Sequence, residues 1–123
     1  MSTQPVLEFS PGDFLIFQLE SGFGLLRVLD VTEMDGEPVW HLAAYRDLFL
    51  DVEMAEKAID EPAKLQIEIP HVALTNRAFE STQVSKLGHS ALNESELKPH
   101  RDWTTSEDPH ISDRSIRLLL GLR

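Results

Sequence analysis

The chain of 123 residues has no cysteine, which excludes disulfide bonds and thiolate metal ligands. It has no apolar run that approaches the ~20 residues of a membrane-spanning helix. The N-terminus lacks a basic region followed by a long apolar stretch, so we expect no secretory signal and a cytoplasmic protein. With 41% hydrophobic residues, the chain is expected to form a single domain over residues 1–123 with a buried core.

Basic residues are scarce in the first half of the chain. The first sixty positions hold twelve Asp or Glu against three Lys or Arg, and the remaining sixty-three hold nine against eight. Almost all of the formal net charge of −10 therefore lies in the first half. Such acidity disfavours a nucleic-acid or anionic-membrane partner and favours a basic protein partner. The alternative is that the charge serves only solubility.

Signatures of catalysis and metal binding are also missing. There is no Gly-x-Ser-x-Gly elbow, and Gly22 and Gly24 precede an expected strand instead of the helix that follows a phosphate-binding loop. The five histidines show neither His-x-His nor His-x-x-x-His spacing. His41 alternates with Val39 and Ala43, which is typical of a half-buried strand residue. We therefore expect no catalytic residue, no cofactor and no metal site.

Alternating apolar residues predict a series of short strands. They are expected at residues 14–19, 23–32, 39–45 and 65–69, with weaker candidates at 72–79 and 82–87. Asp35-Gly36 predicts a hairpin between the second and third strands, because a two-residue type I′ turn needs positive φ at both positions. Arg27 and Asp30 indicate that the second strand is partly exposed. Pro70 indicates that its strand ends there or lies at a sheet edge.

Two segments show helical features. Apolar residues recur at helical spacing over 48–59, with Asp51 or Asp47 as the N-cap. Ser112-Asp113 is expected to cap a last helical turn around 116–120, which is too apolar to be a free tail and should dock on the sheet.

The segment 88–110 is rich in polar residues and contains two prolines, which predicts a long and largely irregular connection. Short strands with few helices favour an α+β fold. We expect a mainly antiparallel curved sheet or small open barrel with one or two short helices.

Two segments near the N-terminus carry a family resemblance. Residues 11–19, Pro-Gly-Asp-Phe-Leu-Ile-Phe-Gln-Leu, and 22–29, Gly-Phe-Gly-Leu-Leu-Arg-Val-Leu, resemble the opening of immunity protein 26. Members of this family protect bacterial cells against their own polymorphic toxins. Residues 85–92 are similar to the family's short strand that ends in a glycine before a polar loop. The resemblance implies a protein-binding role and transfers no catalytic residue.

We interpret the chain as a non-enzymatic, immunity-type protein that neutralises a basic toxin through an acidic surface. Opposite charge would speed the encounter, and a few aromatic residues would supply most of the affinity. Trp103 lies among polar residues, where it is either a lid over the sheet or a contact for the partner. The expected partner-binding residues are Glu33, Asp35, Glu37, Phe49, Asp51, Glu53, Glu56 and Trp103.

Two alternatives stay open. A small enzyme or ligand-binding β-barrel would use the histidines of the polar segment, His89, His100 and His110, and predicts a pocket in which at least two of them converge. An oligomeric interaction module would instead join copies of the chain through an exposed strand edge.

Overall fold

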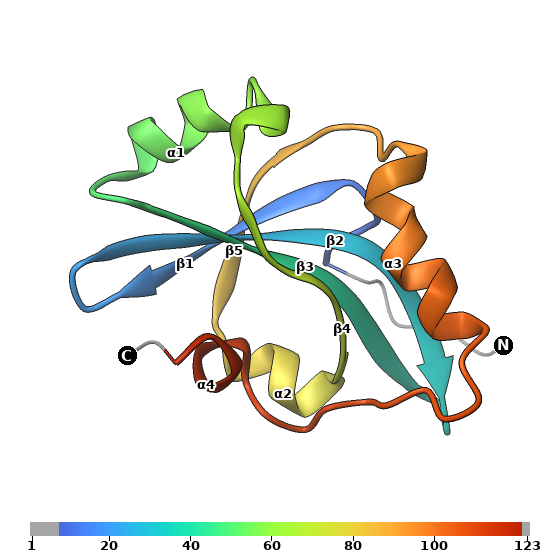
Figure 1. Cartoon of the computed structure of the whole chain (residues 1–123). Helices are drawn as coiled ribbons and strands as arrows, with labels where there is room; N and C mark the ends of the chain where they lie inside the picture. Colours follow the sequence, from blue (N-terminus) through green and yellow to red (C-terminus); the bar gives the residue numbers. More distant parts are fainter. Residues whose placement is uncertain (1–7, 122–123) are drawn as a thin grey trace, which may run out of the picture.

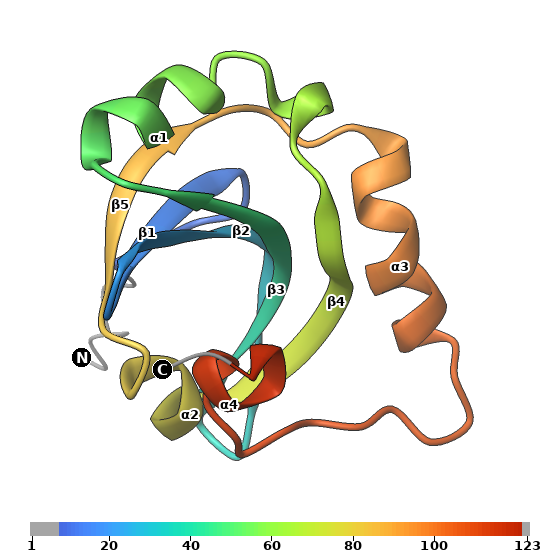
Figure 2. The ribbon, with the colours of Figure 1, turned by 60° about the vertical axis from the view of Figure 1, so that its left-hand side comes forward.

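The computed structural model describes residues 8–121, which form one curved antiparallel sheet with short helices around it (Figure 1). The strand order is β4-β3-β2-β1-β5. The strands are β1 (Asp13–Leu19), β2 (Gly22–Met34), β3 (Glu37–Phe49), β4 (Ile67–Thr75) and β5 (Val84–His89). Within the described range the sheet stays open between its edge strands β4 and β5 (Figure 2). The expected α+β fold with a curved, open sheet is confirmed.

Short helices connect the strands and cover the sheet. α1 (Val52–Ala58) and the 3-10 turn η1 (Pro62–Lys64) link β3 to β4, and α2 (Asn76–Glu80) links β4 to β5. α3 (Glu94–Thr104) and α4 (Ile116–Leu120) follow β5. α3 packs against β2 and β4, whereas α2 and α4 lie together at another end of the molecule (Figure 2). No helix within residues 8–121 combines the length and apolar character that crossing a membrane requires.

The β2–β3 hairpin forms where Asp35-Gly36 predicts it. Asp35 has a φ of 54° and Gly36 a φ of 80°, as a type I′ turn demands. α1 begins after Asp51, whose carboxylate accepts a hydrogen bond from the Met54 N–H at 2.8 Å. Of the two N-caps predicted for this helix, Asp51 is therefore correct. Pro70 lies within the edge strand β4, which is one of the two positions predicted for it.

Both faces of the sheet bury apolar side chains. The core shared with α2 and α4 contains Phe9, Leu15, Phe17, Leu26, Val28, Trp40, Leu42, Leu74, Phe79 and Ile116. A second core lies on the face that carries α1, and its buried members are Phe14, Ile16, Leu25, Tyr45 and Ala55. The last helix docks as predicted, because Ile116 has no exposed surface. Its N-cap, however, is Ser115 instead of Ser112-Asp113.

The second half of the chain contains more helix than the sequence predicted. The segment 88–110 is not an irregular connection, since α3 occupies its centre and begins at a capping box between Asn93 and Glu96. The strand predicted over 72–79 was also wrong in its second part. β4 ends at Thr75, whose hydroxyl accepts the Ala78 N–H and starts α2. The residues on which the expectation of no secretory signal rests lie outside the described range.

The second strand is partly exposed as predicted, from Asp30 to its end, but Arg27 is not part of the exposed stretch, because its side chain is only 1% exposed. The guanidinium lies 3.9 Å from the centre of the Phe14 ring. Its Nη2 donates to the Ser90 carbonyl at 3.1 Å and lies 3.3 Å from a carboxylate oxygen of Glu96. A buried cation is tolerated when it is paired in this way. The pair fixes the first turn of α3 against the sheet.

Candidate functional site

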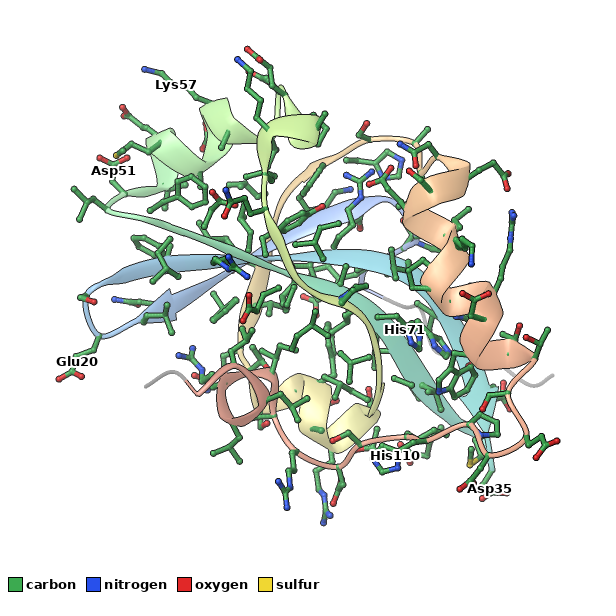
Figure 3. The ribbon with its side chains drawn as sticks, viewed as in Figure 1. Glu20, Asp35, Asp51, Lys57, His71 and His110 are labelled. Carbon is green, nitrogen blue, oxygen red and sulfur yellow. The ribbon has the colours of Figure 1, made fainter. Side chains whose placement is uncertain are left out.

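The predicted acidic surface is divided between the two ends of β3. Three of its residues, Glu33, Asp35 and Glu37, are exposed at the hairpin tip, and the other three, Asp51, Glu53 and Glu56, are exposed at α1. β3 spans 13 residues between these ends, on the order of 40 Å along the strand at ~3.3 Å per residue. Figure 3 shows Asp35 and Asp51 at opposite ends of the molecule. The six carboxylates therefore form two separate surfaces.

The end at α1 combines these acids with exposed apolar side chains. Leu50 is 77% exposed, and Leu48, Val52 and Met54 are exposed beside it. Phe49 is half-buried and packs on the second core, so it supports this surface from below. We call the surface the α1 patch, formed by Leu48, Leu50, Asp51, Val52, Glu53, Met54 and Glu56. Neighbouring exposed apolar residues with a polar rim are typical of protein interfaces.

Two hollows lie beside α1. One is lined by Glu53, Glu56, Lys57, Ile59, Asp60 and Leu87. The other lies between α1, β1 and β5, and it shares Glu56 and Leu87 with the first. The second hollow also contains Lys86, so only the first, with its three acids, suits a lysine or arginine side chain of a partner. The methylene groups of such a side chain would pack on Ile59 and Leu87 while its charged end meets the carboxylates.

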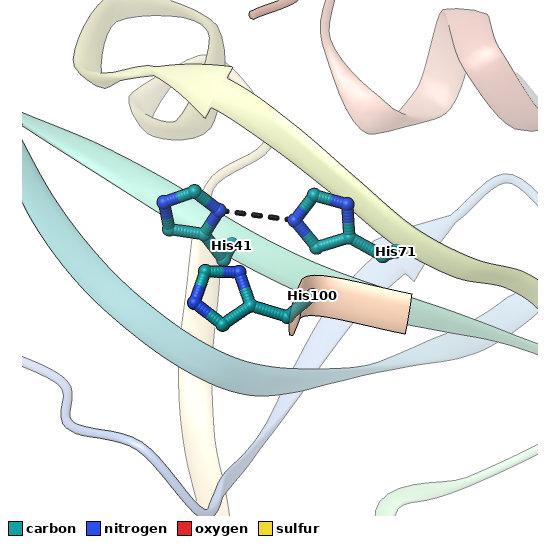
Figure 4. A group of neighbouring side chains, drawn as sticks. All are labelled: His41, His71 and His100. Atoms are coloured by element: carbon teal, nitrogen blue, oxygen red, sulfur yellow. Dashed lines mark hydrogen bonds between the residues drawn. The ribbon is translucent and has the colours of Figure 1, made fainter. Parts of the chain in front are cut away.

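Three histidines from distant parts of the sequence meet between α3 and the sheet. We call His41 of β3, His71 of β4 and His100 of α3 the histidine cluster. One ring nitrogen from each lies within 4.8 Å of the other two. His41 Nδ1 lies 3.0 Å from His71 Nε2, and Figure 4 shows the His100 ring beside this pair. His41 is fully buried, which corrects the expectation of a half-buried residue, and His100 is 7% exposed.

The outer nitrogens of two rings are held by side chains of β2. His41 Nε2 lies 2.8 Å from Thr32 Oγ1, and His100 Nε2 lies 3.0 Å from Asp30 Oδ2. His100 Nδ1 is buried and has no hydrogen-bond partner. Because about nine in ten buried polar groups in proteins are paired, this nitrogen is an exception that calls for an explanation.

Trp103 lies on α3 and covers the histidine cluster. Its ring packs edge-on against His41, with 4.8 Å between the ring centres. Its indole N–H donates to the carbonyl of His110 at 2.8 Å. Trp103 therefore adopts the lid arrangement, one of the two roles that the sequence left open for it.

The three histidines of the polar segment do not come together. Only His100 joins the cluster. His89 Nδ1 lies 2.8 Å from Asp13 Oδ1, and His110 is exposed beyond α3. Within residues 8–121, the histidine cluster is the only group of three ligand-type side chains with mutually close donor atoms.

Burial sets the charge of two cluster members. Burial lowers the pKa of His41 to about 4, with His100 lowering it further and Asp30 acting against this. Burial likewise lowers the pKa of His71 to about 4, with contributions from His41 and His100. Both rings are therefore neutral near pH 7, the form in which an imidazole nitrogen has a lone pair to donate.

One sequence feature indicates part of this cluster, namely that His41 and His71 lie in neighbouring strands. It can be recognised only when the pairing of these strands is known. His41 pairs with Ala73, so His71 is its diagonal neighbour on the same face of the sheet. His100 was predicted as a candidate together with His89 and His110, but its place beside His41 and His71 was not, because α3 itself was not predicted.

Comparison with known proteins yields no match, since no family model, curated protein or solved structure matches the chain. The resemblance to immunity protein 26 therefore stays a prediction.

Proposed function

We propose that this chain is a non-enzymatic, immunity-type protein that binds and neutralises a basic protein through the α1 patch. The observation that carries the proposal is the run of exposed apolar residues set among acids at the start of α1. Leu50 is 77% exposed, and the exposed Val52 stands between Asp51 and Glu53 in the chain. Covering an exposed leucine with a partner removes apolar surface from water and so stabilises the complex. The surrounding carboxylates favour a partner of opposite charge.

The α1 patch is held in a fixed shape before any partner arrives. Ala55 is fully buried in the second core and anchors the middle of α1. The Asp51 carboxylate caps the first turn, and Ile59 packs on the same core just beyond the last turn. A preformed surface loses little conformational entropy on binding, which favours affinity.

The hairpin tip has a smaller role in this proposal. Glu33, Asp35 and Glu37 lie at the far end of β3 from the α1 patch. The screening length at physiological salt is about 8 Å, so these charges contribute little to a contact at α1. Their effect is on long-range attraction at low salt.

The experiment uses a photo-crosslinking amino acid placed at Leu50 in cells of the source organism. Leu118 is the matched control, because it is also an exposed leucine, at 69%, but lies on α4. We expect position 50, and not position 118, to crosslink one basic protein. That protein should inhibit growth when produced alone and lose this effect when wild-type chain is produced with it.

The proposal also requires that Leu50→Asp protects poorly and Leu118→Asp protects like the wild type. Equal protection by both variants, or a crosslinked protein that has no toxicity, would contradict it.

A further inference from the structure

We propose that His41, His71 and His100 bind one divalent transition-metal ion, with zinc as the best fit. Three imidazole nitrogens converge on one point, and neither thiolates nor carboxylates complete the group. Imidazole-only donor sets suit zinc and its neighbours cobalt, nickel and copper better than magnesium or calcium, which prefer oxygen. This inference is independent of the proposed function at the α1 patch.

The spacing of the rings is close to what a metal ion needs. Two nitrogens bound tetrahedrally at the usual zinc distance of about 2.05 Å lie roughly 3.3 Å apart. His41 Nδ1 and His71 Nε2 are 3.0 Å apart, so these two nitrogens need to separate by only a fraction of an ångström, while their rings turn to direct both lone pairs at the ion. The ligand nitrogens of all three residues already lie within 4.8 Å of one another.

The surrounding hydrogen bonds orient the rings as the contacts around a metal site do. Histidine ligands usually use their second nitrogen to contact a carboxylate or another oxygen, which fixes the ring and its tautomer. Here His100 Nε2 contacts Asp30, and His41 Nε2 contacts Thr32. Each ring is thus held at its outer nitrogen, and its Nδ1 is the nitrogen left for a ligand bond.

The unpaired nitrogen of His100 favours a metal site over a plain buried network. A hydrogen bond between His41 and His71 satisfies those two rings without a metal ion. It leaves His100 Nδ1 buried and without a partner. A metal ion supplies a bond to that atom. The proton shared by His41 Nδ1 and His71 Nε2 would move to the other nitrogen of the ring that carries it, so that both facing nitrogens have a lone pair for the ion.

The three ligands come from β3, β4 and α3, so the ion would join the edge of the sheet to the helix. Three histidines leave one tetrahedral position for water or another donor. Trp103 covers the rings and limits access of solvent to them.

The test uses the full chain without a polyhistidine tag, stripped of metal and titrated with Zn²⁺ by calorimetry and with Co²⁺ by visible absorption. We expect one ion per chain and the strong absorption bands of tetrahedral or five-coordinate Co²⁺. His71→Gln and His100→Gln should each weaken binding by at least ~100-fold, because losing a ligand costs more than the 10–100-fold typical of an outer contact. Asp30→Asn should lower the affinity for Zn²⁺ by ~10-fold or more.

His110→Gln is the matched control, because it removes an exposed histidine outside the cluster. It should bind Zn²⁺ within about twofold of the wild type. Circular dichroism shows whether each variant is folded, and His71 is the preferred position because its side chain is only half-buried. Absence of stoichiometric binding, the weak bands of octahedral Co²⁺, or equal losses in His71→Gln and His110→Gln would overturn the proposal.

Discussion

The α1 patch and the histidine cluster both involve β3, but the two regions meet water in opposite ways. Leu50 in the patch is 77% exposed, whereas His41 in the cluster has no exposed surface. An exposed leucine contributes hydrophobic stabilisation only when another molecule covers it. A buried imidazole must find partners within its own chain or in a bound ion. The contrast separates a surface suited to a second protein from an interior suited to a small ion.

The largest effect that we expect is on stability, and it should be confined to the cluster. His41→Ala should lower the free energy of unfolding of the metal-free protein by about 3 kcal/mol, through a cavity and the loss of bonds to Thr32 and His71. Leu50→Ala should change it by less than about 0.5 kcal/mol. Urea denaturation followed by circular dichroism measures both. Similar losses in the two variants would erase the contrast between the regions.

A somewhat smaller loss should follow when α3 is loosened from the sheet. Glu96→Gln keeps a side-chain acceptor for the Asn93 N–H but removes the charge that faces buried Arg27. We expect a cost of about 2 kcal/mol, because an uncompensated buried charge is left behind. Glu94→Gln is the control, since Glu94 lies in the same turn but its partner Arg101 is exposed, and it should change stability little. Equal effects of the two variants would mean that the charge of Glu96 does not stabilise the buried Arg27.

Affinity for the partner should depend on the α1 patch and not on the histidine cluster, the reverse of the order expected for stability. Leu50→Asp should weaken binding of the crosslinked basic protein by ~30-fold, about 2 kcal/mol, because it places a charge in the centre of the contact. His71→Gln should leave this affinity within about twofold. Calorimetric titration with the purified partner gives both values. A loss with His71→Gln as large as with Leu50→Asp would place the histidine cluster in the interface.

The smallest effect should come from charge alone. Removing two acids of the α1 patch, in Glu53→Gln with Glu56→Gln, should slow association several-fold at low salt and have little effect at high salt. The corresponding change at the hairpin tip, Glu33→Gln with Glu37→Gln, should slow it less. Stopped-flow kinetics at several salt concentrations compares the pairs. A larger effect at the tip would indicate that the partner binds at the other end of β3.

Local signals account for what the sequence predicted well. Asp35-Gly36 specifies its hairpin because few other dipeptides adopt positive φ twice, and Asp51 specifies the start of α1 because its side chain completes the cap. Of the α1 patch, only the acids Asp51, Glu53 and Glu56 were predicted from the sequence, and the exposure of its apolar residues became visible only in the structure.

The histidine cluster could not be predicted in this way, because its members are brought together by strand pairing and by α3. A capping box at Asn93 and Glu96 was a signal for that helix. Pro99 concealed it, since proline inside a helix removes the hydrogen bond to the carbonyl of Ser95. Ser95 is exposed, so water can satisfy that carbonyl and the helix continues through the proline to His100.

A metal ion held between the three rings of the histidine cluster would have a direct spectroscopic signature. The most direct measurement is X-ray absorption at the zinc edge of protein loaded with one equivalent of Zn²⁺. We expect three imidazole nitrogens at about 2.0 Å with one further light atom, and loss of one imidazole in His100→Gln. A six-coordinate shell of oxygen atoms, unchanged in that variant, would contradict a site formed by the three histidines.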